Sequence, residues 1–231
     1  MKFKDLPVPR VTLRAELDQL EVEQLAVDID RPVLTIELLK SRGIENEQLQ
    51  KAMKPELSKI RQPTGMAGYQ DLMNLLLEAK RDGLKIGVFG DYDVDGVTSA
   101  TILSTFLEGC GYAVTVRVAT RESGYGIGIA DADALIADGA QVVLMADLGT
   151  SDTETLLHLR EKGIRTGIMD HHVVPKDRPP VDAFINPHQE GCEFPFKGYA
   201  PRVCHSTSVL ALRPCCAKRA MRHRTRVTCW T

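Results

Sequence analysis

The sequence lacks long hydrophobic runs, is poor in aromatic residues and carries almost no net charge. Aromatic side chains make up 5% of the 231 residues, and 29 basic side chains against 31 acidic ones give a formal net charge of −2. Apolar runs stop at about half a dozen residues, short of the roughly 20 that a membrane-spanning helix needs. We therefore expect a globular, cytoplasmic protein without a membrane partner. Any affinity for nucleic acid must come from a local patch or a metal site, because the overall charge is close to zero.

The composition divides the chain into three predicted parts. Residues 1–65 contain five prolines that separate short helical stretches, which predicts a mostly helical N-terminal lead-in. Residues 66–200 are expected to form the main domain. Residues 201–231 are a basic, cysteine-rich tail, in which 202–231 hold six arginines, one lysine and no acidic residue, so that this stretch carries about +7 and the remainder about −9.

The middle part alternates strand-like and helix-like segments. Apolar residues at three- and four-residue spacing predict a helix over 69–81. It is followed by four runs rich in β-branched residues, at 85–89, 113–118, 141–146 and 165–169, separated by helical patterns near 97–109, 129–138 and 153–162. This alternation predicts an α/β fold, a Rossmann-like parallel β-sheet with helices on both faces, preceded by the mostly helical N-terminal segment. Such sheets bind ligands beyond the carboxyl ends of their strands.

Acidic residues and histidines gather at three of these predicted strand ends. They follow the first, third and fourth runs, as Asp91, Asp93 and Asp95, then Asp147, then Asp170, His171 and His172. Carboxylates crowded into one crevice repel one another and titrate abnormally unless cations lie between them. An oxygen-rich set with one or two histidines suits Mn²⁺ or Mg²⁺ better than structural Zn²⁺, which prefers thiolates in a closed tetrahedron.

Three simpler explanations compete with a metal site. The pattern Asp-x-Asp-x-Asp-Gly also opens an EF-hand loop, but the twelfth position, which needs Glu, is Ile102, and the preceding segment is strand-like rather than helical. Aspartates such as Asp95 and Asp152 could cap the helices that follow them. His171 and His172 could form a hydrogen-bonded surface pair. Each explanation suits one position, whereas a metal site accounts for all three strand ends together.

In this order and spacing the motifs resemble those of a known family. Asp93-Val94-Asp95-Gly96, Asp147-x-Gly149 and Asp170-His171-His172 look like the first three motifs of the DHH phosphoesterases. The longer string at 90–99, together with Gly124-Tyr125-Gly126 and Ile185-Asn186-Pro187, resembles the RecJ branch, the single-strand-specific 5′-to-3′ DNA exonucleases of DNA repair and recombination. The resemblance covers about residues 36–200.

The resemblance implies a hydrolase with a two-metal site, supplied with Mn²⁺ or Mg²⁺, that cleaves phosphodiesters of single-stranded DNA. Asp93 would serve one metal and Asp95 the other. Asp147 would bridge both metals, and His171 would complete the second site.

The remaining site residues are implied to act around the metals. His172 would face the scissile phosphate, where it stabilises charge or protonates the leaving oxygen. Asp91 and Asp170 would be a further ligand or supporting partners. Arg121 and Gly149 are candidate substrate contacts, Arg121 because a guanidinium matches the geometry of a phosphate.

The sequence departs from the family pattern at two places. Around the second motif it reads Ala146-Asp147-Leu148-Gly149-Thr150, where the family usually has Val-Asp-Asn/Cys-Gly-Ile. The bridging Asp is kept, so we expect tuning rather than loss of the site. After residue 200 the family's Gly/Ala/Val-rich helix, its fourth Asp-bearing motif and its second domain are not recognisable.

The tail at 201–231 has three explanations. Arginines without acidic neighbours could form a nucleic-acid arm. The cysteines and His223 could bind Zn²⁺, although adjacent Cys215 and Cys216 do not match the usual Cys-x₂-Cys pairs. We favour a reading frame shifted near residue 200, which would leave a truncated enzyme with impaired exonuclease activity, because the change in composition and the loss of the family pattern coincide.

Two other functions are compatible with the sequence. One is a DHH phosphodiesterase that acts on short oligonucleotides or cyclic dinucleotides, and the other is a non-catalytic nucleic-acid-binding relative. The Gly124-Tyr125-Gly126 and Asn186-Pro187 strings favour the exonuclease over the first. The retained aspartates and histidines favour an enzyme over the second.

Overall fold

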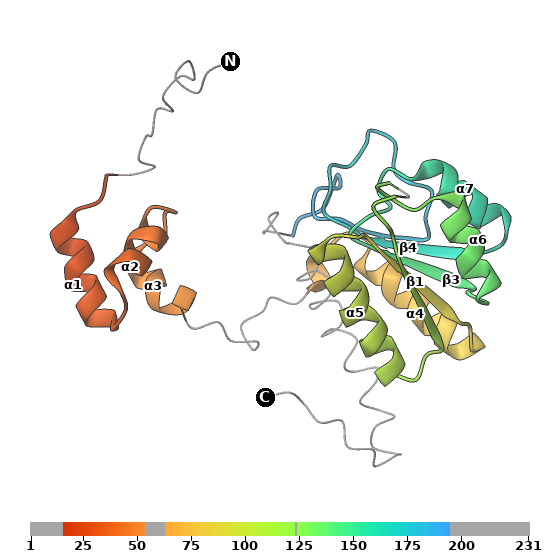
Figure 1. Ribbon diagram of the computed structural model, residues 1–231, viewed down its shortest axis with the longest axis horizontal. Helices are drawn as coiled ribbons and strands as arrows, with labels where there is room; N and C mark the ends of the chain where they lie inside the picture. Colours follow the sequence, from red (N-terminus) through yellow and green to blue (C-terminus); the bar gives the residue numbers. More distant parts are fainter. Residues whose placement is uncertain (1–15, 54–62, 123, 195–231) are drawn as a thin grey trace, which may run out of the picture. The chain divides into compact units, whose positions relative to one another are not determined.

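The computed structural model describes residues 16–53, 63–122 and 124–194 (Figure 1). The chain divides into two compact units, Met1–Ile60 and Arg61–Thr231, and each is described by itself. The tail at 201–231, with its three explanations, lies outside the described residues. Within the described residues, no helix combines the length and the apolar character that a membrane span requires.

The first unit is helical, as the sequence predicts. It contains α1 (Gln19–Ile29), α2 (Val33–Lys40) and α3 (Asn46–Met53). Asp18 caps α1, because its carboxylate accepts hydrogen bonds from the backbone N–H groups of Leu20 and Glu21. The three helices bury one small apolar cluster, made of Val22, Ala26, Ile36 and Leu49.

The second unit is built on a five-stranded sheet in which every pair of neighbours is parallel. The strands are β1 (Ile86–Gly90), β2 (Val114–Val118), β3 (Val142–Ala146), β4 (Arg165–Met169) and β5 (Ala183–Ile185). The parallel sheet and its first four strands confirm the sequence prediction. β5 was not predicted, because a strand of three residues carries too little pattern to be seen in a sequence.

Helices cover both faces of this sheet, as predicted. A 3₁₀ turn, η3 (Pro63–Gly65), precedes α4 (Tyr69–Asp82); the other helices are α5 (Val94–Gly109), α6 (Ile129–Ala137) and α7 (Thr153–Glu161). Side chains of α4 and α5 pack in one apolar cluster with one face of the sheet. Those of α6 and α7, which Figure 1 shows close together, pack in a second cluster with the other face.

The central strands are fully buried because both faces are covered. In β3, Val142 and Leu144 belong to the cluster with α4 and α5, while Val143 and Met145 belong to the cluster with α6 and α7. All four side chains are 0% exposed, and burying one such side chain stabilises a protein by about 1.5–3 kcal/mol. This explains why the strands read as continuous apolar runs rather than as alternating ones.

The strand order places the predicted site. The order across the sheet is β2-β1-β3-β4-β5, so the chain moves from β1 to one side for β2 and later builds β3 and β4 on the other side. In doubly wound sheets of this order, ligands bind in the crevice where the direction reverses, here beyond the carboxyl ends of β1 and β3. The residues after these two strands are Asp91 and Asp147.

Candidate metal centre

The segment after β1 supplies two carboxylates and the start of a helix. Asp91 is 3% exposed, and its carboxylate accepts a hydrogen bond from the backbone N–H of Tyr92 at 2.7 Å. Asp93 is the N-cap of α5 and accepts from the N–H of Gly96 at 2.9 Å. The expectation that Asp95 caps this helix is therefore wrong, because α5 starts one turn earlier than predicted and Asp95 lies within its first turn. Burial raises the pKa of Asp91, and the negative charge of Asp93 adds to this effect.

Gly96 allows this helix to start close to β1. A Cβ atom at Gly96 would lie 2.4 Å from the backbone nitrogen of Asp91 and 2.5 Å from its carbonyl oxygen. No side chain fits at that distance, so the glycine of the Asp-x-Asp-Gly motif brings the first turn of α5 against the end of the strand. The positive end of the helix is thereby directed at the carboxylates.

Asp147, directly after β3, has the most unusual environment of the candidate residues. Its φ is 69°, in the left-handed region that Asp tolerates better than most residues. The residue is 1% exposed, and among the described residues its Oδ1 atom has no hydrogen-bond partner. Burial and the negative charge of Asp93 raise its pKa to about 8. A buried carboxylate oxygen without a donor fits a bound cation.

Asp170, directly after β4, is buried but well supplied with hydrogen-bond donors. Its Oδ1 accepts from the backbone N–H of His171 at 2.7 Å and lies 2.7 Å from Nδ1 of His172. Its Oδ2 accepts from the hydroxyl of Thr150. Burial by itself would raise the pKa of Asp170, but the hydrogen bonds from Thr150 and His172 outweigh it and lower the pKa. Asp170 is therefore an ionised carboxylate that holds the two histidines.

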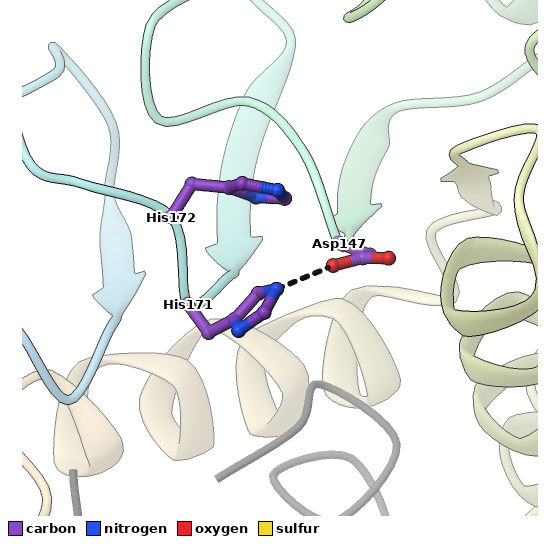
Figure 2. Close-up of side chains that lie close together, drawn as sticks. All are labelled: Asp147, His171 and His172. Atoms are coloured by element: carbon purple, nitrogen blue, oxygen red, sulfur yellow. Dashed lines mark ion pairs between the residues drawn. The ribbon is translucent and has the colours of Figure 1, made fainter. Parts of the chain in front are cut away.

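The two histidines point from β4 toward Asp147 (Figure 2). Nε2 of His171 lies 3.4 Å from Oδ1 of Asp147. Burial lowers the pKa of His171, and the positive charge of His172 lowers it further, so His171 is a neutral imidazole, the form that binds metals. The backbone carbonyl of His172 accepts a hydrogen bond from Asn186 at 2.9 Å, which ties the loop after β4 to the end of β5.

These side chains form two groups that share Asp147. Asp91, Asp93 and Asp147 offer ligand atoms within 4.8 Å of one another, and so do Asp147, His171 and His172. The family resemblance implies that Asp147 serves both metals, and Asp147 belongs to both groups. Asp95 lies in the first turn of α5, outside both groups, although its charge contributes to the raised pKa of Asp147.

The two candidate substrate contacts, Gly149 and Arg121, lie outside both groups of ligand atoms. Gly149 has a φ of 104°, and a Cβ atom there would lie 3.0 Å from the side chain of Ile168, so the backbone of this turn requires a glycine. Arg121 is exposed, in the loop after β2, and belongs to neither group. Both roles stay predictions.

Three residues around the site were missed by the sequence analysis. The hydroxyl of Thr150 donates a hydrogen bond to the carboxylate of Asp170, and the side-chain amide of Asn186 donates one to the backbone carbonyl of His172. The hydroxyl of Tyr125 lies 2.9 Å from Nδ1 of His172. Thr150 lies in the same loop as Asp147 and could have been included on that ground. Tyr125 and Asn186 were recognised only as parts of motifs, because nothing in the sequence shows that their loops reach β4.

The fold and the site together define an α/β protein with a candidate two-metal centre at the switch point of a parallel sheet. The sequence model of the DHH family, N-terminal domain, matches residues 85–227, and the chain belongs to this family. The matched range includes all the strand-end carboxylates and histidines described above.

The chain is also similar to curated proteins named single-stranded-DNA-specific exonuclease RecJ. The protein of Haemophilus influenzae is 37% identical over 166 residues, which are 71% of this chain and 28% of that protein. The protein of Escherichia coli K12 is 33% identical over 205 residues, 86% of this chain and 34% of that protein. The chain thus spans about a third of the length of these relatives.

Solved structures show the same fold. The crystal structure of an exonuclease RecJ bound to manganese is 28% identical and matches with a TM-score of 0.59, over 64% of this chain and 38% of that one. The structure of RecJ from Thermus thermophilus in complex with Mn²⁺ is 21% identical with a TM-score of 0.62, over 87% of this chain and 28% of that one. The second likeness concerns the fold alone.

Proposed function

We propose that this chain is a RecJ-like, metal-dependent phosphodiesterase that degrades single-stranded DNA from the 5′ end, in DNA repair and recombination in the cytoplasm. The observation that carries the proposal is the position of Asp147, a buried carboxylate shared by two groups of metal-ligand atoms, with one oxygen that no donor satisfies among the described residues. Support for the substrate comes from the relatives, which are named for their action on single-stranded DNA.

The residues present fit two divalent cations, Mn²⁺ or Mg²⁺. Asp91 and Asp93 would hold one with Asp147, and His171 would hold the other with Asp147. Carboxylate oxygens suit both ions, and neutral imidazole favours Mn²⁺. When bound, such a pair lowers the pKa of water and neutralises charge on a phosphate.

The protein's own part in the proposed reaction is to orient groups and to move a proton. Asp170 accepts the hydrogen of Nδ1 in His172, because an ionised carboxylate can only accept. This assigns the Nδ1–H tautomer and leaves the lone pair on Nε2. Nε2 can therefore take up a proton, and the resulting imidazolium can stabilise charge on the phosphate or pass that proton to the leaving oxygen, as the motif implies.

The test is hydrolysis of a 5′-labelled single-stranded oligonucleotide by the purified chain with MnCl₂, with excess EDTA, or with MgCl₂ in place of manganese. The proposal expects release of nucleotides from the 5′ end that requires metal and is lost in Asp147→Asn. The same oligonucleotide annealed to its complement should be a poor substrate. Cleavage that persists in EDTA, or that Asp147→Asn retains, would contradict the proposal.

A further inference from the structure

The loop after β2 presents Tyr125 to the metal centre in a defined position. Gly124 and Gly126, on either side of it, have φ values of 89° and 91°. A Cβ atom at Gly126 would lie 2.5 Å from Oδ1 of Asp152, so only glycine allows the loop to lie this close to the start of α7.

Two hydrogen bonds fasten the loop just beyond the tyrosine. The N–H of Ile127 donates to Oδ2 of Asp152 at 3.0 Å, and the hydroxyl of Thr155 donates to the carbonyl of Ile127 at 2.8 Å. Thr155 is 5% exposed. Asp152 and Thr155 belong to the start of α7, so the loop after β2 is tied to the segment that follows Asp147.

The ring and the hydroxyl of Tyr125 both contact His172. The two rings are T-shaped with centroids 5.4 Å apart, and the phenol oxygen lies 2.9 Å from Nδ1. The single hydrogen on Nδ1 is directed to Asp170 at 2.7 Å. The tyrosine cannot donate to a nitrogen that already carries this hydrogen, so its oxygen is at most a second acceptor there.

Among the residues that the structure describes, the hydrogen of the phenol is therefore left without an acceptor. His172 supplies the one hydrogen-bond contact that Tyr125 has within the described residues. Its side chain is half-exposed, with a relative exposure of 53%, and it lies beside the histidine that is proposed to face the phosphate. A protonated phenol next to an anionic group is a donor that strengthens as charge builds on that group.

We propose that Tyr125 is a catalytic residue of this site, whose hydroxyl donates a hydrogen bond to a non-bridging oxygen of the phosphate that His172 serves. The nature of the substrate rests on the proposed function, whereas the choice of Tyr125 rests on the geometry of its loop. It makes Tyr125, rather than the exposed Arg121, the phosphate contact that this loop supplies.

The test compares the wild-type chain with Tyr125→Phe, which keeps the ring and removes the hydroxyl. Tyr112→Phe is the matched control, because that hydroxyl bonds the carbonyl of Leu76 away from the carboxylates. Three quantities are measured: kcat/KM on a single-stranded oligonucleotide with Mn²⁺, the Kd of thymidine 5′-monophosphate with Mg²⁺ by calorimetry, and the tautomer of His172 from ¹⁵N NMR of the metal-free protein.

We expect Tyr125→Phe to lower kcat/KM and to weaken the nucleotide roughly 10- to 100-fold, as for a lost hydrogen bond to a charged group. His172 should keep its Nδ1–H tautomer, since Asp170 sets it, and Tyr112→Phe should change neither constant. Equal constants for the two variants would overturn the inference, and so would loss of the tautomer in Tyr125→Phe, which would mean that the hydroxyl acts on His172 instead.

The measurements separate the two proposals. If the wild-type chain hydrolyses DNA and Tyr125→Phe has the same kcat/KM and Kd as Tyr112→Phe, the proposed function is supported and the role of Tyr125 is rejected. A wild-type chain that binds the nucleotide but does not hydrolyse DNA rejects the proposed function, and a weaker Kd in Tyr125→Phe then still supports the phosphate contact.

Discussion

The carboxylate of Asp170 lies 2.7 Å from Nδ1 of His172 and is itself held by the hydroxyl of Thr150. This chain of contacts fixes the orientation and the tautomer of a histidine that reaches the candidate metal centre. In metal sites such supporting carboxylates tune affinity and activity although they do not bind the ion.

Asp170→Asn should therefore weaken catalysis without removing a ligand. The amide can present N–H to His172 and favour the other tautomer, so we expect kcat with Mn²⁺ to fall about 10- to 100-fold. Asp133→Asn is the matched control, because Asp133 lies 2.7 Å from a ring nitrogen of His158 on the surface. Equal kcat values for the two variants would show that Asp170 does not act through His172.

Replacing Asp147 should stabilise the metal-free protein while removing its response to metal. Asp147→Asn removes the repulsion between a buried carboxylate and its neighbours, and Tm in EDTA should rise by about 2–4 °C for each 1 kcal/mol by which the repulsion is reduced.

In the wild type, Mn²⁺ at 100 times its Kd should stabilise the fold by about 2.7 kcal/mol. Calorimetry should find no such increase in Asp147→Asn. Asp138→Asn, which breaks a surface ion pair with Arg117, should keep the response, and a metal shift that survives in Asp147→Asn would refute the bridging role.

The stability of the metal-free protein should fall as the pH rises from about 4 to about 8. The pKa of Asp147 is raised from 3.8 to about 8 in the folded state, whereas the unfolded chain releases this proton near the ordinary value. Between these two values the folded state binds more protons, so the contribution is full below pH 4 and is lost as the pH approaches 8. Urea titrations in EDTA at several pH values measure the slope. Asp147→Asn should flatten it, and an unchanged slope would assign the effect to other groups.

Gly96→Ala should destabilise the protein and disturb the metal centre. The added Cβ would collide with the backbone of Asp91 at 2.4 Å, so the start of α5 must move; we expect a loss of about 1–3 kcal/mol in the free energy of unfolding. Gly109, at the other end of the same helix, has open space at its Cβ position. Gly109→Ala should be neutral or stabilise by up to about 1 kcal/mol. Similar unfolding curves for both variants would contradict the close approach at Gly96.

Much of this architecture follows from local patterns. The four runs could be predicted as parallel strands because they are rich in apolar and β-branched residues and alternate with helices; Val142–Ala146 is buried along its whole length, whereas the edge strand Val114–Val118 is partly exposed and alternates with polar residues. The ends of those strands then gave Asp91, Asp147 and His171 as candidate ligands. The shared position of Asp147 in both groups agrees with the role that the family motif implies, and that role stays a prediction.

Other features depend on contacts between distant segments and could not be predicted. β5 is too short to leave a pattern, so the support that Asn186 gives to His172 could not be anticipated. Tyr125 lies 47 residues before His172 in the sequence. Its loop lies beside His172 because hydrogen bonds tie the loop to the start of α7. The expected start of α5 near residue 97 was three residues late, because Asp93 is both a helix cap and a member of a candidate metal group.

The candidate ligands directly follow β1, β3 and β4, which are adjacent in the sheet. Neighbouring strands are about 4.8 Å apart in any sheet, close to the roughly 3.5–4 Å between the ions of two-metal sites. The pairing of the strands thus sets the spacing of the side chains that would hold the two ions. Loops around the crevice can change in length without altering this interval, whereas a shift in strand pairing would spoil it at once.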